Sequence, residues 1–465
     1  MNNPASTVPI NEAIIEQTLS RLAHPDAKQI HDVLAKALEM KGLDLSDVAV
    51  LSSISDPELM GELFAAARKV KEQIYGQRLV MFAPLYISNL CANECLYCAF
   101  RARNQEVHRR ALSQEEIAEE TRIIVNQGHK RVLVVAGESY PREGFSYVLK
   151  AIETVYSVHE GRGEIRRANV NVAPLTMDEF KLLKDAKIGT YQIFQETYHR
   201  ATYKAVHLSG KKADYDWRVS APDRAMQSGI DDVGIGVLFG LFDWRFELLA
   251  LMQHIQHLES KFGVGPHTVS MPRLEPATGS DMASHPPKPV SDVDFRKLVA
   301  IIRLAVPYTG IIMSTRETPN LRRETFALGV SQISAGSRTN PGGYADGEKN
   351  DWSQFSLGDH RSLDEAVRDV AQLGYIPSFC TSCYRVGRTG KDFMDVAKPG
   401  DIKYHCDPNA LSTFLEYLLD YASPATRETG EKLIRDTLLN MNPLQRSVSE
   451  SLIEKVRSGN RDVFC

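Results

Sequence analysis

The sequence of 465 residues predicts an α/β protein built around a (β/α)8 barrel. From residue 79 onward, short apolar runs alternate with amphipathic helical segments, a pattern typical of a parallel sheet. There are eight such units, which is the number that closes a barrel, and an open doubly wound sheet is the alternative. Either arrangement places the functional site at the carboxyl ends of the strands.

The barrel, residues 79–340, is expected to lie between two further parts. Residues 1–78 are predicted to form a helical N-terminal extension, because Asp56-Pro57 is a helix-start signal followed by one apolar face. Residues 341–465 are predicted to form a mostly helical C-terminal domain, entered through a polar loop over 339–361. The predicted strands are 80–88, 132–136, 168–173, 191–194, 232–238, 267–271, 310–314 and 332–335.

Composition limits the classes of function. With 43% apolar and 25% charged residues the chain is ordinary for a globular protein, and its net charge of -4 gives no reason to expect nucleic acid or an anionic membrane as partner. Residues 1–9 lack the features of a signal peptide, and the most apolar run, 233–242, is too short to span a bilayer. We therefore expect a cytoplasmic protein with no membrane or nucleic-acid partner.

The most informative stretch is the loop after the first predicted strand, which carries Cys91, Cys95 and Cys98. Three thiolates on one short loop can hold three corners of an iron–sulfur cube. Because no fourth thiol lies nearby, one iron would stay open to a small molecule. The alternatives are a zinc knuckle or scattered buried cysteines, but zinc sites usually close with four N or S ligands in paired spacings, which this loop lacks.

A second set of three cysteines, Cys380, Cys383 and Cys406, has the spacing C-x2-C-x22-C and again no fourth thiol. In a large chain without a secretory signal, clustered cysteines indicate a metal more often than disulfides. A structural zinc site completed by His405 is the alternative to a second cluster. The seventh cysteine, Cys465, is interpreted as incidental.

Polar side chains follow three of the predicted strands. Glu138 comes after Gly137, whose missing side chain lets the backbone approach a ligand, and its carboxylate could hold an ammonium group; an ordinary turn is the alternative. Glu196 could contact a cofactor or substrate, or form a salt bridge. Arg316 offers a bidentate clamp for a carboxylate, with an ion pair to Glu317 or Glu196 as the alternative.

The C-x3-C-x2-C loop, with an aromatic residue before its last cysteine, resembles the signature of the radical S-adenosylmethionine (SAM) enzymes. The resemblance implies a TIM barrel of the radical SAM type and a [4Fe–4S] cluster on Cys91, Cys95 and Cys98. The open iron of that cluster would bind the amino and carboxylate groups of SAM. By the same resemblance, the residues expected around SAM are Tyr97 near the adenine, Gly137 and Glu138 at the amino group, and Glu196.

Both cysteine sets together resemble a narrower family, the radical SAM tyrosine lyases that act as [FeFe]-hydrogenase maturases. The resemblance covers nearly the whole chain and includes the segments 195–198, 265–268 and 314–317. Neither cysteine motif departs from the pattern of that family. The C-terminal domain is therefore expected to carry a second, auxiliary iron–sulfur cluster on Cys380, Cys383 and Cys406.

This resemblance implies two linked reactions. At the first cluster, SAM gives methionine and a 5′-deoxyadenosyl radical, which takes a hydrogen from the amino group of L-tyrosine. The Cα–Cβ bond then breaks to give p-cresol and dehydroglycine, with Arg316 holding the substrate carboxylate. At the second cluster, dehydroglycine becomes carbon monoxide and cyanide, captured on an additional iron together with a free cysteine. A reductant such as ferredoxin or flavodoxin and other hydrogenase maturation proteins are the implied partners.

The additional iron needs a protein ligand, and we choose His267. It opens the sixth predicted strand, so it is expected at the N-terminal mouth of the barrel, opposite the radical site. A C-terminal domain that caps this mouth would place its cluster beside His267. The alternative is a histidine that only caps a strand end by hydrogen bonding. His254 and His257 are rival ligands, but they are expected on a helix.

Two rival interpretations predict different chemistry. The 2-iminoacetate synthase of thiamine biosynthesis is proposed to share the tyrosine cleavage, but as a family it lacks the C-terminal cysteine triad. A non-catalytic iron–sulfur scaffold would cleave no SAM. That scaffold would leave Glu138 and Arg316, both at strand ends, without a purpose.

Overall fold

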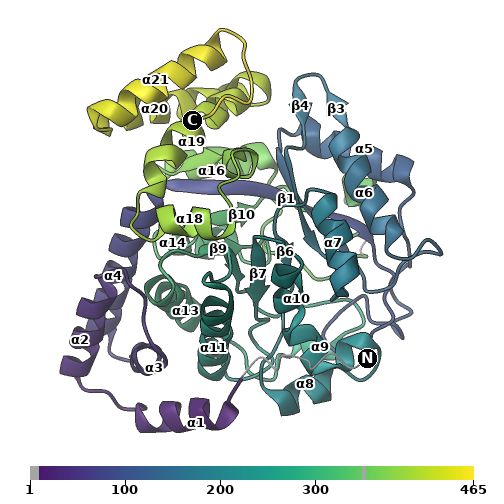
Figure 1. The fold of residues 1–465 in the computed structure, drawn as a ribbon, viewed down its shortest axis with the longest axis vertical. Coiled ribbons are helices and arrows are strands. Elements are labelled where there is room, and N and C mark those ends of the chain that lie inside the picture. The colour runs from purple at the N-terminus through teal and green to yellow at the C-terminus, as the bar shows by residue number, and fades with distance from the viewer. Residues whose placement is uncertain (1–9, 348–351) are drawn as a thin grey trace.

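The computed structural model describes residues 10–347 and 352–465 and is centred on a closed barrel of eight parallel strands (Figure 1). The last barrel strand pairs with the first, with Val80 opposite Gln332, so the predicted barrel is confirmed and the open sheet is wrong. Predictions that fall on residues 1–9 and 348–351 lie outside the described residues. The barrel strands are β1 Arg78–Ser88, β2 Arg131–Ala136, β5 Arg167–Asn171, β6 Tyr191–Gln192, β7 Val233–Gly236, β8 Thr268–Ser270, β9 Gly310–Met313 and β10 Gln332–Ser334.

The strands form where the sequence is apolar because both of their faces are covered. All 11 residues of β1 are buried, one face lying inside the barrel and the other under helices. The helices that follow the strands begin at the predicted signals: the side chains of Ser113 and Thr176 each accept a hydrogen bond from the backbone N–H three residues on. These outer helices are α5 Gln114–Asn126, α6 Ser146–Ser157, α7 Met177–Asp185, α11 Trp244–Phe262, α13 Asp292–Ala305, α14 Pro319–Phe326 and α16 Leu363–Gln372.

The N-terminal extension is helical as predicted and packs on the outer helices α11 and α13 (Figure 1). Asp56 caps its longest helix by accepting hydrogen bonds from the backbone N–H groups of Glu58 and Leu59, with Pro57 in the first turn. The helices of the extension are α1 Glu12–Arg21, α2 Ala27–Ala37, α3 Leu45–Ser52 and α4 Pro57–Tyr75.

Several short elements were not predicted. They are too brief to show a clear hydrophobic period, so only tertiary packing defines them. The most consequential lie in the long connection between β6 and β7, because that connection folds back over the carboxyl ends of the strands. The unpredicted elements are the hairpin β3 His159–Glu160 with β4 Gly163–Glu164, the helices α8 Arg200–Val206, α9 Tyr215–Val219, α10 Ala221–Gln227, α12 Asp281–Ser284 and α15 Gly343–Asp346, and the 3-10 turn Lys211–Ala213.

The C-terminal segment joins the barrel through an unpredicted ninth strand, β11 Ile376–Ser378, which pairs with the first half of β1. Pro377 argues against a central strand, but β11 is an edge strand, where proline is tolerated. Helices occupy much of the segment between Cys383 and Cys406. The helices after β11 are α17 Ser382–Arg385, α18 Gly390–Ala397, α19 Ile402–Asp420, α20 Pro424–Asn440 and α21 Pro443–Arg457.

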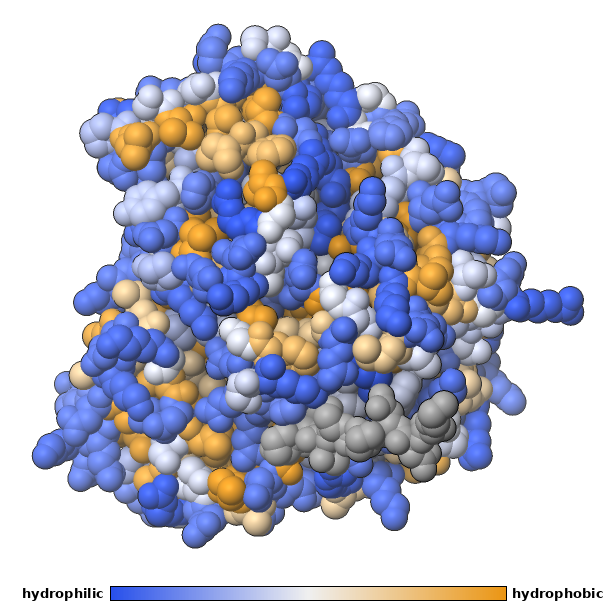
Figure 2. Space-filling model, viewed as in Figure 1, coloured by the Kyte–Doolittle hydropathy of each residue, from blue (hydrophilic) through white to orange (hydrophobic). Residues whose placement is uncertain are grey.

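The C-terminal helices form a cap over the end of the barrel where β1 begins (yellow-green in Figure 1). Apolar side chains lie on the outer face of this cap, over α20 and α21 (Figure 2), and Leu439 and Leu444 of these helices are 71% and 76% exposed. Within residues 10–347 and 352–465, no helix combines the length and the apolar character needed to cross a bilayer.

Candidate metal centres at the two mouths of the barrel

The first cysteine set lines a cavity of about 190 Å³ at the carboxyl-terminal mouth of the barrel. The cysteine loop follows β1 directly, and backbone hydrogen bonds fix its shape, from Cys98 N–H to the Cys95 carbonyl at 3.1 Å and from Ala102 N–H to the Asn93 carbonyl at 2.8 Å. Cys91, Cys95 and Cys98 are therefore presented together by one short, ordered loop.

The three thiols of the first mouth fit a cluster better than a single ion. In the described part of the chain, no three Cys, His, Asp or Glu side chains converge as ligands of one metal ion, which is what a zinc knuckle requires. Sulfurs that hold separate corners of a cube need not converge on a point. Burial raises the pKa of both Cys95 and Cys98, so these thiols need the positive charge of bound iron to ionise.

Two carboxylates and two cations form a buried network beside the thiols. Arg218 Nη1 donates to Glu138 Oε1 at 2.7 Å, and Asn93 Nδ2 donates to Glu138 Oε2 at 2.8 Å. Lys212 Nζ donates to Glu196 Oε1 at 2.6 Å, and Arg218 Nη2 lies 3.7 Å from the same oxygen. Burial alone would raise the pKa of Glu138, but Arg218 and Lys212 hold it below its usual value. An ionised Glu138 can attract an ammonium group. Its carboxylate would then be shared between that group and Arg218.

Glu196 sits in a strained turn that α11 holds in place. Its φ is 71°, in the left-handed region that residues other than glycine seldom occupy. Glu247 accepts hydrogen bonds from the hydroxyl of Thr197 and, at 2.8 Å, from the backbone N–H of Tyr198. Burial raises the pKa of Glu247 to about 7. The salt-bridge alternative for Glu196 is thus present, to Lys212, and this pair lies at the cavity wall.

Gly137 permits a close approach, but not the one predicted. A Cβ atom on Gly137 would lie 2.2 Å from the carbonyl oxygen of Leu90, just before the cysteine loop. The missing side chain therefore lets the end of β2 pack against the cysteine loop, rather than serving only a ligand. Gly137 nevertheless lines the cavity together with Glu138, which follows it.

Tyr97 is buried against His207, a residue that the sequence did not single out. Burial keeps the pKa of His207 well below its usual value, so the ring is neutral. His207 Nδ1 donates to the Tyr203 carbonyl at 2.9 Å, and Nε2 accepts from the Tyr97 hydroxyl at 2.7 Å. The orientation of the Tyr97 ring along the cavity wall is fixed by this bond.

Arg316 lies in the first cavity without an acidic partner among residues 10–347 and 352–465. Glu317 pairs with Arg273 at 2.5 Å instead, and Glu196 pairs with Lys212, so the predicted alternative of an Arg316 ion pair is wrong. Among the described residues, the Arg316 guanidinium makes no ion pair or hydrogen bond, and its carbon lies 3.3 Å from the ring centroid of Phe355. This stacking leaves the nitrogen atoms of the guanidinium free to bind a carboxylate.

Besides His207, four residues that line the first cavity were missed from the sequence. Lys212 and Arg218 come from the connection between β6 and β7, where no long periodic pattern marked a structure. Gln354 and Phe355 come from the loop after β10, and the Tyr86 hydroxyl donates to Gln354 Oε1 at 2.7 Å. The sequence offered one signal for the first two. Lys212 and Arg218 are cations in a connection that must pass the strand ends, where the predicted carboxylates lie.

The second cysteine set lines a smaller cavity at the opposite, N-terminal mouth of the barrel. Its walls include the residues at or next to the starts of four strands, Arg78, His267, Gly310 and Gln332, together with Cys380, Cys383 and Cys406 from the cap. His267 is thus brought beside the C-terminal thiols, as expected from its place before β8. His254 and His257 are on α11, bonded to Tyr198 and Asp223, and neither lines this cavity.

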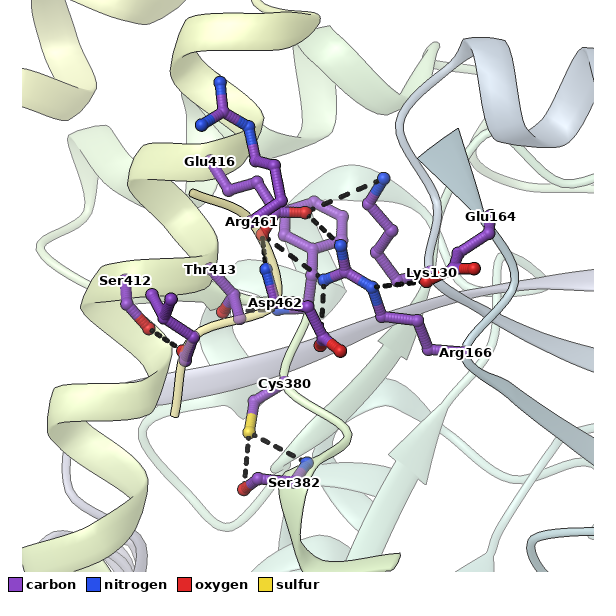
Figure 3. A network of polar contacts seen from close by, with 12 residues as sticks. Lys130, Glu164, Arg166, Cys380, Ser382, Ser412, Thr413, Glu416, Arg461 and Asp462 are labelled. Carbon is purple, nitrogen blue, oxygen red and sulfur yellow. Dashed lines mark hydrogen bonds and ion pairs between the residues drawn. The ribbon is translucent and has the colours of Figure 1, made fainter. Parts of the chain in front are cut away.

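Ion pairs anchor the cap that carries the second cysteine set (Figure 3). Arg166 Nη2 donates to Glu416 Oε1 of α19 at 2.6 Å, and Lys130 Nζ lies 3.8 Å from the same oxygen. Below this network, Cys380 Sγ accepts a hydrogen bond from the Ser382 backbone N–H at 3.4 Å (Figure 3). Buried pairs of this kind fix orientation, because breaking one leaves an uncompensated charge.

The proposed zinc alternative for the second set finds no support in the cavity. His405 does not line it, and neither does Cys465, whose thiol donates to the His405 carbonyl at 3.8 Å. His267 is the histidine that faces the three thiols. Its Nδ1 lies 3.4 Å from Asp232 Oδ1 but makes no hydrogen bond with the described residues, and burial lowers its pKa, which favours the neutral ring that binds metals.

Comparisons with known proteins agree with this architecture. A family model described as the Radical SAM superfamily matches residues 85–252, and one described as the Biotin and Thiamin Synthesis associated domain matches residues 270–376. The 2-iminoacetate synthase of Escherichia coli (strain K12) is 34% identical over 346 residues, which are 74% of this chain and 88% of that protein.

Two solved structures extend the similarity over nearly the whole chain. A crystal structure of HydG, a maturase of the [FeFe]-hydrogenase, is 46% identical with a TM-score of 0.95, and the match covers 98% of this chain and 99% of that chain. The FeFe-hydrogenase maturase HydG from Carboxydothermus hydrogenoformans is 42% identical with a TM-score of 0.84, covering 96% and 98%.

The barrel, its cysteine loop and the superfamily match define the class: this is a radical SAM protein, and that class implies a [4Fe–4S] cluster used with SAM. Here the helical extension and the C-terminal cap are both covered by the same structures. Within the class, the chain belongs to the HydG family.

Proposed function

We propose that the protein is a radical SAM L-tyrosine lyase that forms p-cresol and dehydroglycine and then converts dehydroglycine to carbon monoxide and cyanide. The products would build an Fe–CO–CN precursor for assembly of the [FeFe]-hydrogenase H-cluster. The observation that carries the proposal is the presence of two cysteine-lined cavities at opposite mouths of one closed barrel. A lyase with a second reaction needs two such sites.

At the first mouth, Cys91, Cys95 and Cys98 would hold the cluster, and cluster and SAM together supply the radical that starts the reaction. Glu138 would bind the amino group of SAM, and Tyr97 would border its adenine. Arg316, held flat against Phe355, would bind the carboxylate of L-tyrosine and present its amino group for hydrogen abstraction.

Glu196 would contribute to the same mouth by fixing Lys212 beside the thiols. The Glu196 carboxylate, paired with Lys212, would contact SAM or tyrosine. Because Glu196, Lys212, Arg218 and Glu138 are already bonded to one another, they would need little rearrangement when the ligands bind. This preorganisation is the role we assign to the network.

The barrel interior would carry dehydroglycine from one mouth to the other. On β1 the first cavity is lined by Phe82 and the second by Val80. On β10, Ser334 lines the first cavity and Gln332 the second. The two cavities are therefore separated along these strands by two residues, roughly 7 Å at the usual rise per residue.

At the second mouth, Cys380, Cys383 and Cys406 would hold an auxiliary cluster, and His267 would bind the additional iron. The neutral His267 ring, with a buried nitrogen that lacks a hydrogen-bond partner among the described residues, has the state that metal binding requires. Free cysteine would complete the iron site. A reductant such as ferredoxin or flavodoxin and other hydrogenase maturation proteins would be the macromolecular partners.

The substrate assignment is tested by incubating the reconstituted protein with SAM, L-tyrosine and a reductant. Release of p-cresol with formation of 5′-deoxyadenosine is expected. If SAM is cleaved but no p-cresol appears, tyrosine is not the substrate. If SAM is not cleaved at all, the rival interpretation of a non-catalytic scaffold is favoured.

The division of labour between the two mouths is tested by replacing Cys383 and Cys406 together with alanine. The double variant should still release p-cresol, but carbon monoxide should be abolished or strongly reduced. Unchanged carbon monoxide would show that the second reaction occurs elsewhere. The 2-iminoacetate synthase interpretation predicts no carbon monoxide even from the unaltered protein. The 2-iminoacetate synthase of Escherichia coli (strain K12) matches only 74% of this chain.

The role of His267 is tested by the iron content of His267→Ala. The variant should keep the iron of both clusters and lose the additional iron. His257→Ala is a matched control, because His257 lies on α11 and bonds to Asp223. If the two variants hold the same iron, His267 is only a strand-end histidine.

A further inference from the structure

A side chain from the loop after β10 reaches the first cysteine set. Gln354 Nε2 donates a hydrogen bond to Cys98 Sγ at 3.8 Å, within bonding range of the large sulfur atom. The two residues are 256 positions apart in sequence, so only the tertiary structure brings them together. The proposed function gives Gln354 no role, although it touches one of the three residues that would hold the first cluster.

Cys98 differs from the other two thiols of its set. Its sulfur also accepts a hydrogen bond from the Phe100 backbone N–H at 3.4 Å. In the part of the chain that the structure describes, no hydrogen bond reaches the sulfur of Cys91 or Cys95. The bond from Phe100 comes with the cysteine loop itself, whereas the bond from Gln354 is added from a distant part of the chain.

The orientation of the Gln354 amide follows from its two partners. A thiolate sulfur can only accept a hydrogen bond, so the NH2 group of the amide must face Cys98. The amide oxygen is then left for the Tyr86 hydroxyl, which donates to Gln354 Oε1 at 2.7 Å. Tyr86 is buried on β1, so the barrel holds this partner in place. The amide cannot turn over without losing both bonds.

The loop that carries Gln354 is held by its main chain. The Gln354 backbone N–H donates to the Thr339 carbonyl at 2.9 Å, and the Ser356 backbone N–H donates to the Pro276 carbonyl at 2.8 Å. The residue between them, Phe355, is buried. The Gln354 side chain is therefore not required to keep the loop in position, and a variant at this residue should retain the loop.

We propose that Gln354 raises the reduction potential of the iron–sulfur cluster on Cys91, Cys95 and Cys98 through its bond to the Cys98 sulfur. Reduction adds one negative charge to the cluster and its thiolates, so an N–H donor stabilises the reduced form more than the oxidised form. Hydrogen bonds to the sulfurs are among the factors that set the potentials of such clusters. The apolar side chains around Cys98, which include Phe100, strengthen the bond by excluding water.

The inference rests on the part of the proposed function that places a cluster at the first mouth, and it goes beyond the assignment of the ligands. Each cleavage of SAM uses one electron, which the external reductant must first deliver to that cluster. A higher potential makes this delivery more favourable. Gln354 would therefore ease reduction by a ferredoxin or flavodoxin, whichever substrate the radical then attacks.

The test measures the reduction potential of the first cluster in the full chain, with Cys383 and Cys406 replaced by alanine so that the second cluster does not contribute. The reduced cluster is quantified by electron paramagnetic resonance at stepped potentials without SAM, so no turnover is needed. In Gln354→Leu, the reduction equilibrium should become about three- to tenfold less favourable, which is about 28–59 mV for a one-electron couple. A smaller shift, or a shift to higher potential, overturns the inference.

Ser356→Ala is the matched control, because Ser356 lies in the same loop and its side chain is exposed. Its potential should equal that of the parent protein. A fall as large as in Gln354→Leu would assign the effect to disturbance of the loop and overturn the inference.

A measurement without any variant at Gln354 keeps the test independent of folding. The protein is labelled with 15N in the side-chain amides of glutamine only. Pulsed electron paramagnetic resonance of the reduced cluster should then detect a weak 15N coupling, transmitted through the bond to the Cys98 sulfur. Absence of this coupling overturns the inference.

Failure of this inference can be told apart from failure of the proposed function. If the first cluster assembles and SAM is cleaved, but Gln354→Leu leaves the potential unchanged, only the role of Gln354 is wrong. If iron analysis shows that no cluster assembles on Cys91, Cys95 and Cys98, the proposed function fails, and the inference fails with it.

Discussion

The two mouths of the barrel differ in how much of their buried charge the chain itself pairs. At the first mouth, the cations of Lys212 and Arg218 are bonded to Glu196 and Glu138 before any ligand is present. At the second mouth, Arg78 has no acidic partner within bonding distance in the described chain. A paired network is charge-balanced before a ligand arrives, whereas an unpaired cation such as Arg78, or Arg316 at the first mouth, is left for an anionic group that the described chain does not supply.

The two mouths also differ in how the chain builds them. The first takes its three thiols from one loop after β1, so local hydrogen bonds fix their arrangement. The second takes two thiols from the α17 region and one from the first turns of α19, and it depends on the ion pairs that dock α19 onto the barrel (Figure 3). The second mouth should therefore be the more sensitive to changes far from its thiols.

The comparison is tested most strongly by removing one thiol from each mouth. Cys98→Ser should abolish p-cresol formation, because the cluster that works with SAM loses a corner. Cys383→Ser should leave p-cresol formation intact while carbon monoxide disappears. Product analysis and iron content for both variants are the measurements. Loss of p-cresol in Cys383→Ser would show that the mouths are not independent.

The next largest effect is expected from removing Arg218, the central cation of the paired network. Arg218→Met leaves Glu138 and Glu196 buried with one fewer positive charge, and it should lower the free energy of unfolding by about 3–5 kcal/mol. Arg200→Met removes a surface pair with Asp216 and should cost less than about 1 kcal/mol. Denaturant unfolding of both variants gives the difference, and equal effects would contradict the contrast between buried and exposed pairs.

The strained turn at the first mouth predicts a pH effect on stability. The pKa of Glu247 is about 7 in the folded protein against 4.5 ordinarily, so the folded state binds more protons between these values. Stability from this group is therefore lost as pH rises from about 4.5 to 7, by up to about 3 kcal/mol. Over this window, the free energy of unfolding of Glu247→Gln should change less with pH than that of the unaltered protein.

An equal slope in the two proteins would show that Glu247 keeps an ordinary pKa. Glu259→Gln is a suitable control, because Glu259 lies on the same helix, in contact with Tyr308 rather than with the turn. That control should follow the unaltered protein through the window.

The smallest predicted effect concerns the stacking of Phe355 on Arg316. Phe355→Leu removes a cation–π contact of about 1 kcal/mol, so KM for L-tyrosine should rise about fivefold with kcat little changed. Phe355→Tyr keeps the ring and should stay close to the unaltered protein. A fall in kcat with KM unchanged would show that the ring does something other than hold Arg316.

Much of the first site could be predicted from local sequence, but its partners could not. Cys91, Cys95 and Cys98 are close in space because they are close in the chain, and Glu138 and Arg316 follow strands whose ends meet at one mouth. Lys212 and Arg218 lie in a connection of short helices with no strong periodicity, so their arrival at Glu196 and Glu138 depends on packing.

The sequence by itself determined the barrel, its closing number of strands and both sets of thiols. It could do so because hydrophobic periodicity and ligand spacing are local properties of the chain. Tertiary structure alone decided which charges are paired. It joined β11 to β1, docked α19 so that Cys406 and His267 line one cavity, and left Arg78 without an acid among the described residues, since these arrangements bring together residues far apart in sequence.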